Sequence, residues 1–297
     1  MIMDTKLNID LRLFAGILVL TLALGLALGV LISLELRPDP TIPTGAMPPE
    51  ANAPVSNIPE GTPPETTTGP TLPPNPFGPD DFTYGENGYL TTEAGTAIPG
   101  IDVSEHQQHI DWEQVKASGI EFVMIRVGWR GQAQGMITAD TLAQEYYAGA
   151  KAAGLKIGAY FFSQAISAEE AIDEAEYMLE MIRDWEVDMP LVYDWEPLSP
   201  TDRTSVADSA LLTQCVRGFC DTVATAGYRP MVYFNSFLAD TLLQLGDVKD
   251  YPFWLAMYTH EMDYPHAVEM WQYSCTGQVP GIALPVDLDL WFPESQS

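Results

Sequence analysis

Hydrophobic and polar positions divide the chain into three regions with different patterns. In the first, residues 13–34 form an apolar run without charge, bounded by Arg12 and Glu35. This run is long enough to cross the hydrocarbon core of a bilayer as a helix, and we interpret it as a transmembrane anchor. A cleaved signal peptide is the alternative, but its apolar region is usually shorter, roughly 7–15 residues, and ends at a small-residue cleavage site. Because Lys6 and Arg12 precede the run, residues 1–12 are predicted to be cytoplasmic and the rest of the chain extracellular.

The second region is rich in proline and has no apolar periodicity. Between Pro38 and Pro79 there are 14 prolines in 42 residues, separated mostly by small and polar residues. Such a composition cannot bury a hydrophobic core and favours extended polyproline II structure. We therefore assign residues 35–97 to an extracellular linker that holds a C-terminal domain away from the membrane.

The third region, residues 98–297, alternates short apolar runs with helical patterns. The predicted strands are Gly100–Val103, Phe122–Val127, Lys156–Phe162, Leu191–Trp195, Met231–Phe234, Phe253–Met257, Val268–Tyr273 and Pro285–Leu290, and the predicted helices are Asp111–Ser118, Ala139–Ala153, Ala168–Asp184 and Val206–Ala226. This alternation is typical of an α/β fold, and eight strands suit a closed TIM-like barrel. The last strands follow one another too closely for full helices, so we expect the closing strands to be partly antiparallel. An open doubly wound sheet is the alternative, although no Gly-rich phosphate loop follows the first strand.

The charge of the chain excludes nucleic acid as an expected partner. With 13 basic and 41 acidic residues, the formal net charge is −28, whereas nucleic-acid binding requires Lys and Arg to replace counterions. The histidines and cysteines show no metal-ligand spacing, so we expect neither a metal nor another cofactor. Three cysteines, Cys215, Cys220 and Cys275, are too few for a disulfide-dependent scaffold, and their pairing stays open. We expect the domain to be a monomer.

Acidic residues fall at the ends of three predicted strands. Asp194 and Glu196 are two positions apart at the end of a buried strand, so their side chains point to the same side. Two carboxylates held close together cannot both ionise freely, and one of them can then serve as an acid near neutral pH. Asp102 ends the first strand and Asp287 lies in the last. In barrel enzymes catalytic groups lie at the carboxyl ends of the strands, so these four acids are the candidate catalytic residues. Paired carboxyls of this kind are what a glycosidase requires.

Aromatic residues occupy similar positions along the same strands. Rings at the mouth of a pocket can stack on sugar faces, and their polar tips can donate to hydroxyl groups. Core packing is the alternative role for each ring. The candidate substrate-binding residues are Tyr160, Phe162, Tyr233, Trp254, Tyr258, Trp271 and Gln272.

Several of these segments resemble glycoside hydrolase family 25, the lysozymes also called N-acetylmuramidases. Gly100–Val115 is similar to the family's opening strand and turn, Phe122–Gly128 to its second strand, Ala152–Ser163 to its third, Pro190–Pro197 to its paired-acid strand, and Trp271–Leu288 to its closing segment. The resemblance runs in order from about Ile98 to Phe292. It implies a (β/α)5(β)3 barrel that cleaves the β-1,4 bond between N-acetylmuramic acid and N-acetylglucosamine in peptidoglycan.

By position, the resemblance makes Glu196 the general acid and Asp194 the second carboxylate of the pair. The family's N-terminal and C-terminal acids fall on Asp102 and Asp287. Two positions depart from the pattern: Asp289 stands where Asn is more usual, and Gln108 where Gly is common. Together with the predicted anchor at residues 13–34, the resemblance predicts a membrane-anchored peptidoglycan hydrolase with its catalytic domain outside the cell.

Two other functions compete with this hypothesis. A chitinase-type barrel also carries Asp-x-Glu at a strand end, but its signature requires further acids upstream, where this chain has Met189 and Val192. A non-catalytic wall-binding module on a stalk would keep the aromatic residues and could lose the acids. All four acids are present, which favours an enzyme.

Overall fold

In a computed structural model, residues 72–199 and 201–293 are described. Within these two ranges, no helix combines the length and the apolar character that a bilayer crossing requires. The predicted anchor at residues 13–34 lies outside the described residues, as does the part of the predicted linker before Leu72.

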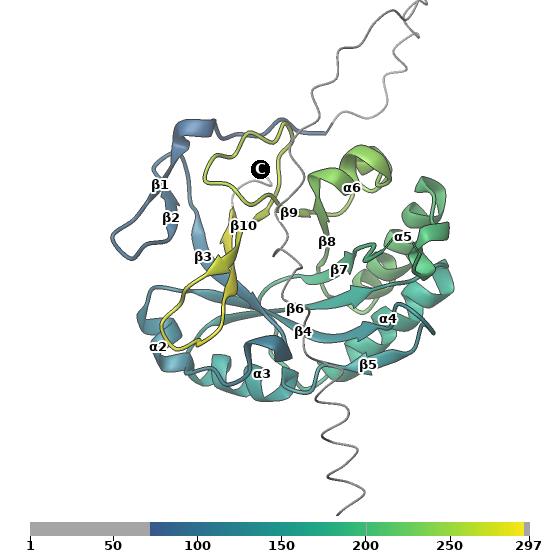
Figure 1. The fold of residues 1–297 in the computed structure, drawn as a ribbon, viewed down its shortest axis with the longest axis horizontal. Coiled ribbons are helices and arrows are strands. Elements are labelled where there is room, and N and C mark those ends of the chain that lie inside the picture. Colours follow the sequence, from purple (N-terminus) through teal and green to yellow (C-terminus); the bar gives the residue numbers. More distant parts are fainter. Residues whose placement is uncertain (1–71, 200, 294–297) are drawn as a thin grey trace, which may run out of the picture. The chain divides into compact units, whose positions relative to one another are not determined.

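Eight strands of the described region close into a barrel (Figure 1). In order around it they are β3 (Ile98–Val103), β4 (Phe122–Arg130), β6 (Lys156–Ser163), β7 (Leu191–Trp195), β8 (Pro230–Asn235), β9 (Phe253–Ala256), β10 (Met270–Gly277) and β11 (Val286–Trp291). Neighbouring strands are parallel except around β11, which is antiparallel to both β10 and β3. Because β3 pairs with β4 as well as with β11, the sheet is closed, and the open doubly wound alternative is excluded. The expectation of a partly antiparallel closure is confirmed.

Alternating side chains on these strands form two apolar cores. One lies inside the barrel and includes Phe122, Met124, Val192 and Met231. The larger core lies outside the barrel, between the strands and the surrounding helices. Gly100 shows how tightly the interior is packed, since a Cβ at this position would lie 2.3 Å from the ring of Phe122. Inward-facing side chains therefore fill the lower part of the barrel, and the site can form only above them.

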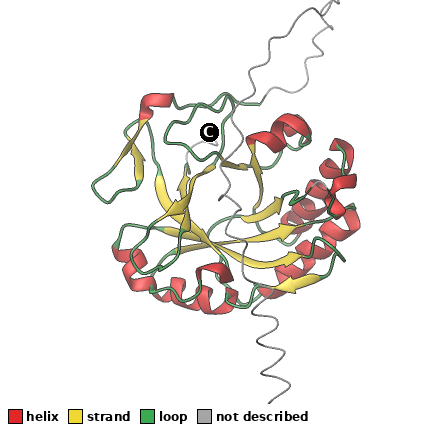
Figure 2. Cartoon of the chain, viewed as in Figure 1, coloured by secondary structure: helices red, strands yellow, loops and turns green. Residues whose placement is uncertain are grey.

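Helices cover the outer side of the sheet (Figure 2). They are α2 (Trp112–Ala117), α3 (Ala143–Ala152), α4 (Ala168–Met181), α5 (Ser209–Thr225) and α6 (Ser236–Thr241), with short 3-10 turns η1 (Pro79–Asp81), η2 (Glu105–Gln107), η3 (Arg203–Val206) and η4 (Leu245–Asp247). Side-chain caps explain where several helices begin. Asp111, Ser167 and Asp208 each accept a hydrogen bond from a backbone N–H in the first turn of α2, α4 and α5. The four predicted helices correspond to α2 to α5.

Two short features were not expected from the sequence pattern. Strands β1 (Phe82–Tyr84) and β2 (Leu90–Thr92) form a hairpin inside the segment assigned to the linker. Phe82 packs edge-to-face on Trp271 at 5.1 Å between ring centroids, so this part of the chain belongs to the barrel domain. Strand β5 (Ile137–Ala139) pairs with the end of β4 outside the barrel and precedes α3, where the pattern predicts only helix.

Candidate active site

The four predicted acids converge on one cleft at the carboxyl ends of the parallel strands. Asp102 comes from β3, Asp194 from β7, Glu196 from the segment after β7, and Asp287 from β11, and all four line a cavity of about 230 Å³. Asp102 and Asp287 are directly opposed in the antiparallel pairing of β3 with β11. Residues opposed in this way have Cβ atoms roughly 5 Å apart on the same face of the sheet. The geometry that the sequence predicts, with four acids around one cleft, is therefore present.

Asp194 and Glu196 form an electrostatically coupled pair. Burial raises the pKa of Asp194 well above its usual value, and the neighbouring Glu196 raises it further, while the Arg126 guanidinium lowers it. Burial also raises the pKa of Glu196, Asp287 adds to this, and a hydrogen bond with Asn235 opposes it. Asp194 Oδ1 has no hydrogen-bond partner among the described residues. The pair can therefore hold one proton at a pH where isolated carboxyls would both be ionised.

The backbone at Glu196 is fixed from the neighbouring strand. The side-chain amide of Gln164, just after β6, donates to the carbonyl oxygens of Glu196 and Ser163. The indole of Trp195 donates to the carbonyl of Ala165 at 2.9 Å. These bonds tie the end of β7 to the end of β6, so that the Glu196 side chain starts from a defined position at the cleft.

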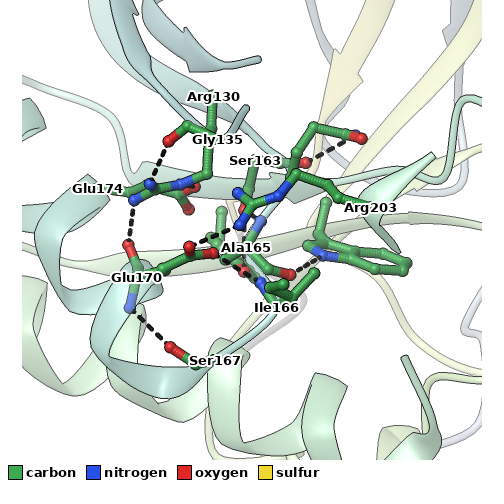
Figure 3. Close-up of polar contacts among 12 residues, drawn as sticks. Arg130, Gly135, Ser163, Ala165, Ile166, Ser167, Glu170, Glu174 and Arg203 are labelled. Carbon is green, nitrogen blue, oxygen red and sulfur yellow. Dashed lines mark hydrogen bonds and ion pairs between the residues drawn. The ribbon is translucent and has the colours of Figure 1, made fainter. Parts of the chain in front are cut away.

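Two arginine–glutamate pairs attach other parts of the chain to helix α4, and one of them involves the segment that follows Glu196 (Figure 3). Arg203 lies 2.6 Å from the Glu170 carboxylate, and Arg130 lies 2.5 Å from that of Glu174, both on α4. Arg130 also donates to the backbone carbonyl of Glu170 at 2.8 Å. Arg203 therefore attaches the turn η3 to α4, the helix that packs behind β6, and Arg130 attaches the end of β4 to the same helix. Charged pairs that are this well buried cost stability when one partner is removed.

The raised pKa of Asp287 makes the free energy of unfolding depend on pH. Burial raises its pKa from 3.8 to about 6, so the folded state binds this proton more tightly than the unfolded state. Its contribution to the free energy of unfolding is then complete below about pH 4 and is lost as the pH rises through 6. We expect Asp287→Asn to match the wild type at pH 4 and to be more stable at pH 7, by roughly 1–2 kcal/mol. Denaturant unfolding at both pH values measures this difference.

The control for that measurement is Asp250→Asn, since the Asp250 side chain is 66% exposed. We expect it to leave the pH dependence of unfolding unchanged. Equal pH slopes for Asp287→Asn and the wild type would contradict the assignment of a raised pKa to Asp287.

Most of the predicted substrate-binding residues line the same cleft. Those that do so are Tyr160, Phe162, Tyr233, Trp254, Tyr258 and Gln272. Tyr258 is 57% exposed at the rim, whereas Trp254 is buried and packs edge-to-face on Tyr233 at 5.0 Å. Gln272 connects them to the acids, because its Oε1 accepts from Tyr233 at 2.9 Å and its Nε2 donates to Asp102 at 2.6 Å.

Trp271 is placed differently from the prediction. Successive side chains on a strand point to opposite faces, so Gln272 faces the cleft and Trp271 faces outward. Its ring lies in the outer core against Phe82 and Tyr273, and its indole donates to the carbonyl of Met257 at 2.8 Å. Trp271 is therefore a packing residue in this structure and does not line the cleft.

The cleft also contains residues that the sequence pattern did not single out as part of the site. They are Ser104, His106, Gln107 and Arg126. Arg126 pairs with Asp140 at 3.0 Å and lies 3.9 Å from Glu105. Its position in the apolar strand β4, in phase with the inward-facing Phe122 and Met124, is the sequence signal that could have identified it. Among the described residues, no cluster of His, Cys, Asp and Glu has the arrangement of a metal site.

The turn after β3 has the backbone of a glycine loop although it carries a larger residue. Gln108 has φ 58° and ψ −134°, and among the described residues it is the only one other than glycine with positive φ. This conformation is strained for a residue with a Cβ. The buried Tyr146 hydroxyl donates to the Gln108 carbonyl, which helps to hold the turn. Gln108 therefore adopts a backbone conformation that is more usual for glycine.

A closed barrel with paired carboxyls at the end of one strand and further acids on its first and last strands defines a glycoside hydrolase. A family model described as "Glycosyl hydrolases family 25" matches residues 101–282. The chain belongs to this family, and the resemblance identified from the sequence is confirmed.

Individual relatives agree with this assignment. An autolytic lysozyme of Clostridium acetobutylicum is 31% identical over 194 residues, which cover 65% of this chain and 55% of that protein. Lysozyme M1 of Streptomyces globisporus is 28% identical over 71% of each protein. This chain therefore spans little more than half the length of the clostridial relative.

Solved structures show the same fold. A bacterial lysozyme from Streptomyces coelicolor superimposes with a TM-score of 0.57 at 25% identity, covering 68% of this chain and 94% of that one. The modular autolysin LytC from Streptococcus pneumoniae has a TM-score of 0.61 at 23% identity, covering 71% of this chain and 52% of that one.

Proposed function

We propose that the barrel domain is an N-acetylmuramidase that hydrolyses the β-1,4 bond between N-acetylmuramic acid and N-acetylglucosamine in peptidoglycan. The observation that carries the proposal is the convergence of Asp102, Asp194, Glu196 and Asp287 on one cleft. Relatives named as lysozymes support the substrate class, as does LytC, whose structure was also solved with a synthetic peptidoglycan ligand. A chitinase-type site is disfavoured because Met189 and Val192 are buried apolar residues of the barrel interior.

In this mechanism Glu196 protonates the glycosidic oxygen. Burial raises the pKa of both carboxyls, so that the pair can keep a proton, and the Arg126 guanidinium opposes this rise at Asp194. The position of Glu196 in the family pattern makes it the general acid, and we place the proton of the pair there and the negative charge on Asp194. As the bond to the leaving sugar breaks, positive charge develops at the anomeric carbon in an oxocarbenium-like state.

Asp194 stabilises that charge in one of two ways. It forms a covalent bond to the anomeric carbon, or it orients the N-acetyl group of the substrate, whose oxygen closes on the same carbon. Both routes retain the configuration of the sugar. Asp102 and Asp287 contact the sugar from the neighbouring strands β3 and β11, and the rings of Tyr160, Tyr233 and Tyr258 provide apolar contact with polar tips.

Purified peptidoglycan tests this function directly. We expect the protein to clear a suspension of walls and to release fragments whose new reducing end is N-acetylmuramic acid, as determined by mass analysis after borohydride reduction. New reducing ends on N-acetylglucosamine, or cleavage only in the peptides, would contradict the proposal. Sedimentation with the wall without clearing would favour the non-catalytic binding module instead.

The proposed location is the outer face of the cell membrane. The charge-free run at 13–34, preceded by Lys6 and Arg12, supports an anchor with residues 1–12 in the cytoplasm and the barrel outside. Protease added to intact spheroplasts should then digest the barrel, and the residual anchor should stay in the membrane fraction. Recovery of the intact protein in the soluble cytoplasmic fraction would contradict this location.

A further inference from the structure

Below the cleft, the barrel holds a fifth carboxyl that the mechanism does not use. Asp289 lies two positions after Asp287 on β11, so it points into the barrel one layer deeper. Its side chain is fully buried. An acid in such a position needs a compensating partner, because a buried charge without one is costly.

The surroundings of Asp289 supply one donor and one acid. Its Oδ1 accepts a hydrogen bond from the indole of Trp254 at 2.9 Å. Its Oδ2 has no hydrogen-bond donor among the described residues. Across β3 and β11, Asp289 opposes Gly100 and Asp287 opposes Asp102, so the Asp289 and Asp102 carboxyls lie on the same face of the sheet. A hydrogen bond between these two side chains lowers the pKa of Asp289. Two carboxylates facing each other in this way repel, whereas a single proton between them converts the contact into a hydrogen bond.

The other charged groups around Asp289 do not neutralise it. Asp287 on β11 raises the pKa of Asp289, whereas the hydrogen bond with Asp102 on β3 lowers it. Asp289 in turn raises the pKa of Asp102 and that of the weak acid Tyr273 on β10. On β9 the neighbour is the uncharged Trp254. Arg126, the cation of the cleft, pairs with Asp140. At the strand ends opposite the cleft, Glu269 is paired with Arg229 and accepts from Trp291.

Asp102 already receives one strong hydrogen bond, from Gln272 Nε2 to its Oδ2 at 2.6 Å. A second hydrogen bond from below would fix the plane of its carboxyl. We propose that Asp289 is a positioning residue that shares a single proton with Asp102, so that the hydrogen bond between the two carboxyls orients Asp102 toward the substrate. The other oxygen of Asp289 accepts a hydrogen bond from the Trp254 indole, so one side chain helps to fix the positions of both Asp102 and Trp254 at the cleft.

This inference rests on the proposed function for the role of Asp102, and three variants test it. Asparagine in Asp289→Asn keeps an oxygen for Trp254 and an N–H donor for Asp102, so it imitates the protonated acid. We expect kcat and KM within about twofold of the wild type and unchanged limbs of the pH profile, since the pair of residues carries one negative charge in both proteins. Asp289→Leu removes the donor, and we expect kcat to fall about tenfold or more at every pH, with a smaller change in KM. Asp289→Ser restores a smaller donor and should recover part of the loss.

Two kinetic outcomes would overturn the proposal. A downward shift of the alkaline limb in Asp289→Asn would show that Asp289 and Asp102 are both charged in the wild type, because removing a negative charge lowers the pKa of the remaining acids. Equal kcat in Asp289→Leu and Asp289→Asn, with both folded by circular dichroism, would show that the donor is not needed.

A spectroscopic measurement separates this inference from the proposed function. Infrared difference spectra at pH 7 between the wild type and Asp289→Asn should show the loss of one protonated carboxyl band, even if the protein cleaves no peptidoglycan. Absence of that band in the wild type would overturn the inference and leave the hydrolase assignment untouched. Presence of the band in a wild type that never releases muropeptides would instead overturn the proposed function.

Discussion

Glu196→Gln is expected to lose lysis of purified walls while keeping the fold. Glutamine has nearly the same shape and can keep the contact with Asn235, but it cannot give a proton to the departing oxygen. General acid catalysis contributes about 100- to 10,000-fold to rate, so kcat should fall by at least this factor with little change in KM. Release of soluble muropeptides over time measures the loss.

The matched control is Glu186→Gln, which makes the same chemical change on a side chain that is 83% exposed. Its lysis rate should equal that of the wild type. Lysis by Glu196→Gln at the wild-type rate would remove Glu196 from the role of general acid. A substrate with an activated phenolate leaving group adds a second check, because such a group departs without protonation and should restore much of the rate to Glu196→Gln.

Asp194→Asn is expected to have the second-largest effect, through both rate and pH dependence. The variant loses the negative charge that faces the developing positive charge, and kcat should fall by about 100-fold or more. The residual activity should also have its alkaline limb at lower pH. Coupling between the two carboxyls is mutual, so without the Asp194 charge the pKa of Glu196 falls and the general acid is deprotonated earlier. A pH profile of kcat/KM measures both effects.

Asp184→Asn is the control, since that side chain is 87% exposed. An alkaline limb of Asp194→Asn that stays at the wild-type pH would contradict the coupling. Added azide distinguishes the two routes to the retained product. Azide can replace a missing carboxylate nucleophile at the anomeric carbon, so rescue with an α-azide product would favour covalent attack by Asp194 over participation of the substrate's N-acetyl group.

The positions of the strands and of the four acids could be predicted because both depend on local patterns. Asp102 and Asp194 lie near the ends of apolar runs, whereas Asp287 lies at the start of the last strand. Because that strand is antiparallel to its neighbours, the closed barrel brings all three residues to one edge. The alternation of strands and helices is therefore enough to predict the fold, and the fold then predicts that the acids lie at one edge of the barrel. The same reasoning predicted the rings at Tyr160, Tyr233 and Trp254 in the cleft.

The residues that were missed depend on information that is not local. Trp271, Gln272 and Tyr273 are consecutive, so the pattern alone does not say which of them faces inward, and β10 carries register irregularities after Gln272. Choosing Gln272 as an inward residue would have excluded Trp271. The hairpin around Phe82 follows a proline-rich segment, and its burial depends on a partner almost two hundred residues later. The composition of that segment predicts an extended linker, whereas packing against the barrel stabilises a hairpin in part of it.

Closure of the barrel by its first and last strands also has a consequence for synthesis. Asp102 emerges from the ribosome early, but the strand that carries Asp287 is translated only after every other strand of the barrel. Pairings between such distant segments form slowly, because the intervening chain must be ordered first. A nascent chain therefore has no assembled cleft until β11 is available to pair with β3. Premature termination anywhere before Val286 would yield polypeptides that lack the means to cut a glycan.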